Sequence, residues 1–284
     1  MVDSVHTDVE KKQRLSESVI MHHARQSVAG SLFSLHVLES VDSTNQYLLD
    51  RLQPLQKGFS VCVSETQTAG RGRNDRVWQS PAGASVYLST GYVLESGLMS
   101  QLSRLPLYCG AALAEWLTEH GVTARLKWPN DILSDGRKLA GLLIETRLQG
   151  RAGLVVMGLG LNVDMPVEAM AQVDQPWTDL RQCLLQVSPE AGHLLLNRNW
   201  LVAQLVDVLD RAYGYWHEQN DEWFQSTWQQ YDILQGQEVQ VIAGQDEYSA
   251  RVCGLADDGA LLLQLDGELR QVYAADVKLK IKPC

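Results

Sequence analysis

The feature that most constrains the fold is a row of short apolar segments in the middle of the chain, separated by tight turns. Segments 131–133, 139–146 and 154–163 are rich in Leu, Ile and Val, and the turn formers Asp135-Gly136 and Gln149-Gly150 stand between them. A parallel crossover would need about a dozen residues or more between two strands, which these turns do not provide. The segments therefore predict an antiparallel meander within a mixed, mainly antiparallel sheet.

Further elements surround this meander. Apolar alternation predicts strands at 33–37, 60–65 and 86–93. A helical spacing of apolar residues predicts helices over roughly 101–120, 197–218 and 222–231. Ser43, followed three residues later by Gln46, has the form of a capping box, so a helix begins directly after the first strand. We therefore predict an α+β fold whose central sheet is flanked by helices.

The two ends of the chain differ from its middle. From Gly236 onward the sequence alternates between strands and turns, which predicts a small β-barrel of about fifty residues. Residues 1–32 have thin apolar spacing, which favours a short helix or a frayed arm. The predicted parts are thus an arm at 1–32, a main domain at 33–234 and a barrel at 235–284.

Composition restricts the class of function. A formal net charge of −10 argues against sequence-independent nucleic-acid binding, which needs a basic face. No apolar run reaches the ~18 residues typical of a membrane span, and the first residues lack a hydrophobic signal region, so we expect a cytoplasmic protein. The five cysteines are scattered and never spaced C-x-x-C, so we expect reduced thiols without a disulfide framework or a zinc site.

One loop departs from this acidic balance. Gly70, Arg71, Gly72, Arg73 and Arg76 fall within seven consecutive residues between two predicted strands. Glycine allows positive φ and the close approach of a ligand, and arginine offers a planar fork of donors to carboxylate or phosphate. The pattern fits a flexible loop that orders around an anion, and it fits about as well a solvated turn whose arginines pair with surface carboxylates. It matches neither a Walker loop nor a dinucleotide-binding G-x-G-x-x-G.

Three further segments carry polar residues or glycines where predicted strands end or bend. They are Lys127-Trp128-Pro129-Asn130-Asp131, Lys138-Leu139-Ala140-Gly141 and Gly158-Leu159-Gly160-Leu161-Asn162. Taken singly, a strand terminus, a lysine after a hairpin turn and a bulged strand explain them. Their order along the chain is the informative property.

Together with Asp42-Ser43-Thr44-Asn45, Gln67 and the Gly/Arg loop through Trp78, these segments resemble one family, the biotin protein ligases, also called biotin–[acetyl-CoA-carboxylase] ligases. The resemblance spans roughly residues 33 to 280 and includes an SH3-like C-terminal barrel. It implies a carbon–nitrogen ligase with biotin and ATP as substrates and Mg²⁺ as the metal. Biotin would be activated to biotinyl-5′-AMP with release of pyrophosphate, and a lysine of biotin carboxyl carrier protein would then accept the biotin.

The resemblance also implies roles for individual residues. The biotin-binding set is Ser43, Thr44, Asn45, Gln67, Arg71, Gly72, Arg73, Lys138, Gly141 and Gly158. The adenylate-binding set is Arg71, Arg73, Arg76, Asn162 and Trp177. The catalytic set is Arg71, Arg73, Lys138, Lys127 and Asp131. Two anions must meet in the first step, so fixed positive charge is needed there. Whether Lys127 and Asp131 orient pyrophosphate and metal or guide the incoming lysine stays open, and no protein metal site is predicted.

Two departures from the family pattern bear on function. Asp75 stands where the family usually has glycine, and its charge lies beside arginines that must hold an anion, so we expect a working ligase whose loop orders less tightly. Many bacterial members carry a DNA-binding domain ahead of the catalytic part, which about 30 weakly patterned residues cannot form. No DNA partner is therefore expected, and related enzymes often pair into homodimers through the central sheet.

Three other interpretations compete with this one. A lipoate or octanoate ligase or transferase has a similar fold and chemistry but lacks the Gly/Arg loop. A sensor that binds biotinyl-adenylate without transferring biotin would dispense with Lys138 and Arg71, which are both present. A generic anion-binding module would leave the ordered series of motifs unexplained.

Overall fold

The computed structural model describes residues 14–24, 32–52, 58–74, 76–149, 152–171, 173, 175–185, 194–274 and 277–281. Asp75, Cys284 and most of the predicted arm lie outside the described residues, so the expectation for Asp75 stays a prediction. Within the arm, α1 (Glu17–Ala24) is an α-helix that buries Ile20 and Ala24. Of the two alternatives predicted for this region, a short helix is thus present at Glu17–Ala24.

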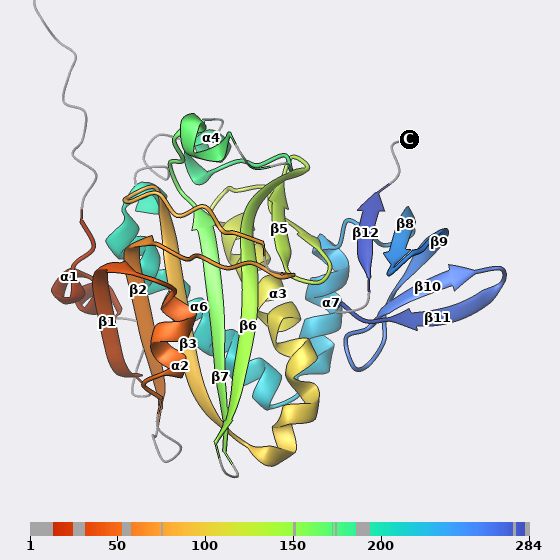
Figure 1. Cartoon of the computed structure of the whole chain (residues 1–284), viewed down its shortest axis with the longest axis horizontal. Helices are drawn as coiled ribbons and strands as arrows, with labels where there is room; N and C mark the ends of the chain where they lie inside the picture. The colour runs from red at the N-terminus through yellow and green to blue at the C-terminus, as the bar shows by residue number, and fades with distance from the viewer. Residues whose placement is uncertain are drawn as a thin grey trace, which may run out of the picture.

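A seven-stranded mixed sheet forms the centre of the molecule (Figure 1). Its strands, in spatial order, are β1 (Leu32–Val41), β2 (Phe59–Gln67), β3 (Ser85–Glu95), β7 (Ala152–Asn162), β6 (Arg137–Gln149), β5 (Asp131–Ser134) and β4 (Arg125–Lys127). Strands β4 to β7 pair consecutively and antiparallel, which confirms the meander. Strands β1 and β2 pair in parallel, and α2 (Thr44–Leu49) lies in the crossover between them.

Helices cover both faces of this sheet, because β2 and its neighbours bury alternate side chains on opposite sides. Val61 and Val63 belong to the large core with α3 (Leu105–Glu119), α6 (Arg198–His217) and α7 (Asp221–Tyr231). Cys62 packs instead with the leucines of α2. Helix α2 lies on the opposite face of the sheet from α3 and α6 (Figure 1). The mixed α+β class is thereby confirmed. None of the described helices is long and apolar enough to cross a membrane.

One predicted boundary is wrong. The helix expected over 101–120 begins at Leu105, because residues Ser96–Arg104 form the 3-10 helix η1. Pro106 lies in the first turn of α3, where its missing N–H removes no intrahelical hydrogen bond. Two shorter helices, η2 (Val167–Met170) and α4 (Leu180–Leu184), follow β7.

The C-terminal part forms a separate antiparallel sheet of five strands. Their spatial order is β11 (Glu268–Val272), β10 (Leu261–Leu265), β9 (Asp246–Leu255), β8 (Glu238–Ala243) and β12 (Lys278–Ile281). Trp128 Nε1 donates to the carbonyl of Gly259 at 3.1 Å, and Ser103 Oγ donates to that of Asp258 at 2.8 Å. These hydrogen bonds attach the small sheet to the main domain. The domain limits at 33–234 and 235–284 stay predictions.

Candidate active site

The floor of the site is a row of residues across the middle of the large sheet. Gly158 of β7 pairs with Ser89 of β3 on one side and with Leu143 of β6 on the other. A Cβ at Gly158 would lie 2.4 Å from Asn45 Oδ1, so no side chain fits there. Glycine thus lets the Asn45 amide lie directly on the sheet.

Asn45 is held by Leu143 and Ser89 of that row and by Glu145, which lies two residues further along β6. Its Nδ2 donates to the Leu143 carbonyl at 3.2 Å and to Glu145 Oε2 at 2.8 Å, and its Oδ1 lies 2.6 Å from Ser89 Oγ. A carbonyl and a carboxylate only accept hydrogen bonds, so the amide nitrogen must face them. The Asn45 carbonyl is therefore presented towards Gly158 and the floor.

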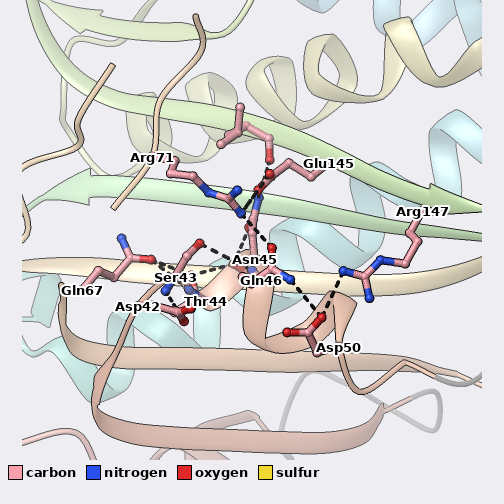
Figure 2. A network of polar contacts seen from close by, with 12 residues as sticks. Asp42, Ser43, Thr44, Asn45, Gln46, Asp50, Gln67, Arg71, Glu145 and Arg147 are labelled. Carbon is pink, nitrogen blue, oxygen red and sulfur yellow. Dashed lines mark hydrogen bonds and ion pairs between the residues drawn. The ribbon is translucent and has the colours of Figure 1, made fainter. Parts of the chain in front are cut away.

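The start of α2 brings the neighbouring polar residues to this floor (Figure 2). Ser43 is the N-cap, and its Oγ accepts from the backbone N–H of Gln46 at 3.5 Å. Thr44 donates to Gln67 Oε1 from its backbone N–H at 2.9 Å and from Oγ1 at 3.1 Å. Only half of the predicted capping box forms, because Gln46 Nε2 donates to Asp50 at 2.9 Å and not to the N-cap residue.

A second row places Trp78 beside the floor. Gly160 of β7 pairs with Tyr87 of β3 and with Gly141 of β6. A Cβ at Gly160 would lie 2.4 Å from Trp78 Cε2, and one at Gly141 would lie 3.2 Å from Trp78 Cζ3. Both glycines therefore make room for the indole ring, and Lys138 Nζ lies 5.2 Å from the centre of that ring.

The Gly/Arg loop folds back on itself above these rows. Trp78 N–H donates to the Gly70 carbonyl at 2.9 Å, and Gly72 N–H donates to the Arg76 carbonyl at 2.7 Å. Asn74, with φ of 54°, takes the left-handed conformation, whereas Gly70 and Gly72 have no positive φ. Gly70 is needed for space instead, because a Cβ there would lie 2.5 Å from the Trp78 carbonyl oxygen.

Three cations of the site have partners of different kinds. Arg71 Nη2 lies 3.0 Å from Glu145 Oε1, and the Arg71 side chain is 43% exposed. Lys138 Nζ lies 2.7 Å from Asp131 Oδ1, and the Lys138 side chain is only 15% exposed. Arg73 donates to Asn130 Oδ1 at 3.3 Å and to the carbonyl of Ala274 in the C-terminal part. Burial lowers the pKa of the Arg73 guanidinium from its ordinary value.

A cavity of about 530 Å³ joins these parts. It is lined by thirteen of the fifteen residues predicted for the site, namely Ser43, Thr44, Asn45, Gln67, Arg71, Gly72, Arg73, Arg76, Lys127, Asp131, Lys138, Gly141 and Gly158. Asn162 and Trp177 do not line it. Asn162 Nδ2 donates to the Thr178 carbonyl at 3.0 Å, and the Trp177 backbone pairs with Lys138. The roles predicted for all fifteen residues stay predictions.

Sequence reasoning missed several residues of this region. Glu145 and Ser89 hold Asn45, Asn130 holds Arg73, and Val277 and Leu279 of the C-terminal part line the cavity. For Glu145 a signal exists, because it follows Gly141 by four residues along one strand and so shares its face.

Comparisons with known proteins identify the family of this chain. The model of the Biotin/lipoate A/B protein ligase family matches residues 37–162, and that of the Biotin protein ligase C terminal domain matches residues 235–280. The Bifunctional ligase/repressor BirA of Escherichia coli is 37% identical over 274 residues, which are 95% of this chain and 82% of that protein. A Biotin--[acetyl-CoA-carboxylase] ligase of Mycobacterium tuberculosis is 32% identical over 86% of this chain and 88% of that protein.

A solved structure agrees on the fold. The biotin protein ligase from Aquifex aeolicus in complex with biotin and ATP has a TM-score of 0.69 at 23% identity, covering 88% of this chain and 100% of that one. The first family model defines the class as the biotin and lipoate protein ligases. The identity to full-length relatives and the C-terminal match narrow it further, and this chain belongs to the biotin protein ligase family.

Proposed function

We propose that this protein activates biotin with ATP and transfers it to a lysine of a carrier protein. In the first step an oxygen of the biotin carboxylate attacks the α-phosphorus of ATP. The bond from that phosphorus to the β-phosphate oxygen breaks, and pyrophosphate leaves. In the second step the neutral lysine amine attacks the acyl carbon of biotinyl-5′-AMP, AMP leaves, and the amine gives up a proton.

The observation that carries this proposal is the presence of two kinds of polar side chain in one cavity. Neutral donors and acceptors on Ser43, Thr44, Asn45 and Gln67 line it, and they suit the urea of the biotin head group. Five cationic side chains line the same cavity, namely Arg71, Arg73, Arg76, Lys127 and Lys138. Two anions repel each other as they meet, and fixed positive charge offsets that repulsion in the transition state.

Individual roles follow from these positions. Arg71, Arg73 and Lys138 would neutralise the biotin carboxylate and the α-phosphate, with Gly72 leaving the loop backbone open to them. Gly141 and Gly158 would line the path of the valeryl tail. Arg76 would contact the adenylate, and Asn162 and Trp177 would do so only if the segment beside Lys138 moved towards the cavity.

Magnesium enters this proposal with the nucleotide. The described residues contain no group of three or more His, Cys, Asp or Glu side chains that could hold a metal ion. Asp131 is an acidic residue that lines the cavity, and Mg²⁺ is commonly held by one or two carboxylates together with substrate phosphates. Asp131 therefore fits a metal ion that is brought by ATP. The positive charge of that ion would offset the negative charge of the departing pyrophosphate.

The proposed acceptor is the biotin carboxyl carrier protein of an acetyl-CoA carboxylase. The names of relatives in Paracoccus denitrificans and Mycobacterium tuberculosis support this choice. Homodimer formation and a cytoplasmic location stay predictions from the sequence.

Mass spectrometry of a carrier domain tests the function directly. The domain is incubated with the protein and Mg-ATP, and biotin, lipoate and octanoate are offered in parallel. We expect a biotinyl adduct on one lysine of the carrier. A lipoyl or octanoyl adduct in its place would assign the protein to the other branch of the class. Bound biotinyl-adenylate without any adduct would indicate a sensor.

A further inference from the structure

We propose that Glu145 is a positioning residue that competes with the anionic group of the ligand for Arg71. Arg71 Nη2 lies 3.0 Å from Oε1 and 3.1 Å from Oε2 of Glu145, so one guanidinium nitrogen faces both carboxylate oxygens. The proposal rests on the proposed function only in taking biotin as the ligand. In this proposal Glu145 is the partner of Arg71 when no ligand is bound, and the carboxylate or phosphate of the ligand replaces Glu145 as that partner.

The position of Glu145 on the sheet supports this assignment. Glu145 pairs in register with Val156 of β7, whose side chain packs with α2 on the same face as the floor. The Arg71 side chain reaches Glu145 and also lies 3.4 Å from Gln46 Oε1 at the start of α2 (Figure 2). Glu145 thus connects the loop to the residues that form the floor.

The second contact of Glu145 lowers the free energy that is needed to separate Arg71 from Glu145. Its Oε2 accepts from Asn45 Nδ2 at 2.8 Å, so the carboxylate keeps a donor after Arg71 leaves. The side chain of Glu145 is 22% exposed and that of Arg71 43% exposed, so water also solvates the separated charges. Pairs of this exposure contribute little to stability, so the interaction holds Arg71 without locking it.

Two ligands of similar shape, one charged and one uncharged, separate this role from general stabilisation. We would measure the Kd of biotin and of biotinamide, its uncharged amide, by calorimetry for the wild type and for Glu145→Gln. Glutamine has the same shape and can still accept from Asn45, but it removes the competing charge. We expect the ratio of the biotinamide Kd to the biotin Kd to rise about two- to fivefold.

Three further variants serve as controls. Glu145→Asp keeps the charge and should keep the wild-type ratio. Glu145→Ala also frees Asn45, so both ligands should bind more weakly. Asp50→Asn removes one negative charge from an exposed residue of the same network, which contacts Arg147 at 3.0 Å, and should leave the ratio unchanged.

A measurement without ligand completes the test. Trypsin cleaves after arginine, and release of Arg71 in Glu145→Gln should speed cleavage of the loop about two- to fivefold. An unchanged Kd ratio together with unchanged cleavage would overturn the role of Glu145. If the wild type bound neither biotin nor biotinamide, the proposed ligand would be wrong, while the cleavage rates would still decide whether Glu145 holds the loop.

Discussion

The floor of the cavity and the loop above it are built in opposite ways. On the floor, Thr44, Asn45 and Ser89 are nearly inaccessible to solvent, and Ser89 Oγ lies 2.6 Å from Asn45 Oδ1 and 2.7 Å from Thr44 Oγ1. In the loop, Arg71 is 43% exposed, and its ion pair with Glu145 is shared with water. A buried, fully bonded group resists rearrangement, whereas an exposed ion pair rearranges at little cost. The floor is therefore preorganised, as the proposed binding of a neutral head group requires, whereas the ion pair of the loop can be exchanged for a ligand anion.

The largest effect is expected from Lys138, a cation that lines the same cavity. Lys138→Ala removes the ammonium that is proposed to neutralise both anions, and it leaves Asp131 without this partner. We expect biotinyl-adenylate formation to slow about 100- to 1,000-fold, as for the loss of one preorganised donor. Pyrophosphate release in a single turnover measures it.

A neighbouring variant provides the control for Lys138. Arg137 bonds Gln182 at 3.2 Å and does not line the cavity. Arg137→Ala should therefore keep the wild-type rate. Equal rates for Lys138→Ala and the wild type would remove Lys138 from the chemistry.

The next effect concerns the rigidity of the floor. In Gly158→Ala the new Cβ lies 2.4 Å from Asn45 Oδ1, so the amide must leave its place. Overpacking of this kind costs about 1–3 kcal/mol, and we expect the affinity for biotin to fall about tenfold or more in calorimetry.

Gly214→Ala is the matched control for the floor glycine, because nothing lies within 4 Å of a Cβ there. It should leave biotin binding unchanged and stabilise α6, since alanine favours a helix over glycine. If both alanine variants bound biotin as the wild type does, the floor would be less rigid than its contacts indicate.

A smaller effect is expected from one hydroxyl of the floor. Ser89→Ala removes the donor that lies 2.6 Å from Asn45 Oδ1. The loss of one such hydrogen bond amounts to about 1 kcal/mol, or roughly fivefold in biotin affinity. Ser64 is an equally buried serine of β2, and its Oγ donates to the Thr66 carbonyl at 2.8 Å. Ser64→Ala should lower the melting temperature without this loss of affinity.

The floor was more predictable from sequence than the contacts of the loop, and the reason is distance along the chain. The Ser43 cap and the glycines of β7 leave local marks, because capping and close packing depend on neighbouring residues. The pair of Arg71 with Glu145 spans 74 residues, and that of Arg73 with Asn130 spans 57 residues. Such contacts arise only once the sheet has brought its strands together.

The C-terminal part illustrates the same limit on a larger scale. Its strands and turns are visible in the sequence, and the antiparallel sheet confirms them. No local pattern reveals that Val277 and Leu279 line the cavity or that the Ala274 carbonyl accepts from Arg73. These contacts depend on how two folded parts dock, which periodicity does not encode. Roles of single residues, such as those of Asn162 and Trp177, were reached by resemblance alone.

The smallest effect is expected where the loop carries its own negative charge. Asp75 lies between Arg73 and Arg76 in the sequence, so it opposes the attraction of those arginines for an adenylate phosphate. In Asp75→Gly we expect biotinyl-adenylate to dissociate about twofold more slowly, and we expect high salt to abolish the difference, since salt screens exposed charges. Stopped-flow dissociation at low and high ionic strength measures both. A slower rate that persists in high salt would point to backbone freedom at the new glycine, and an unchanged rate at low salt would mean that Asp75 does not weaken the loop.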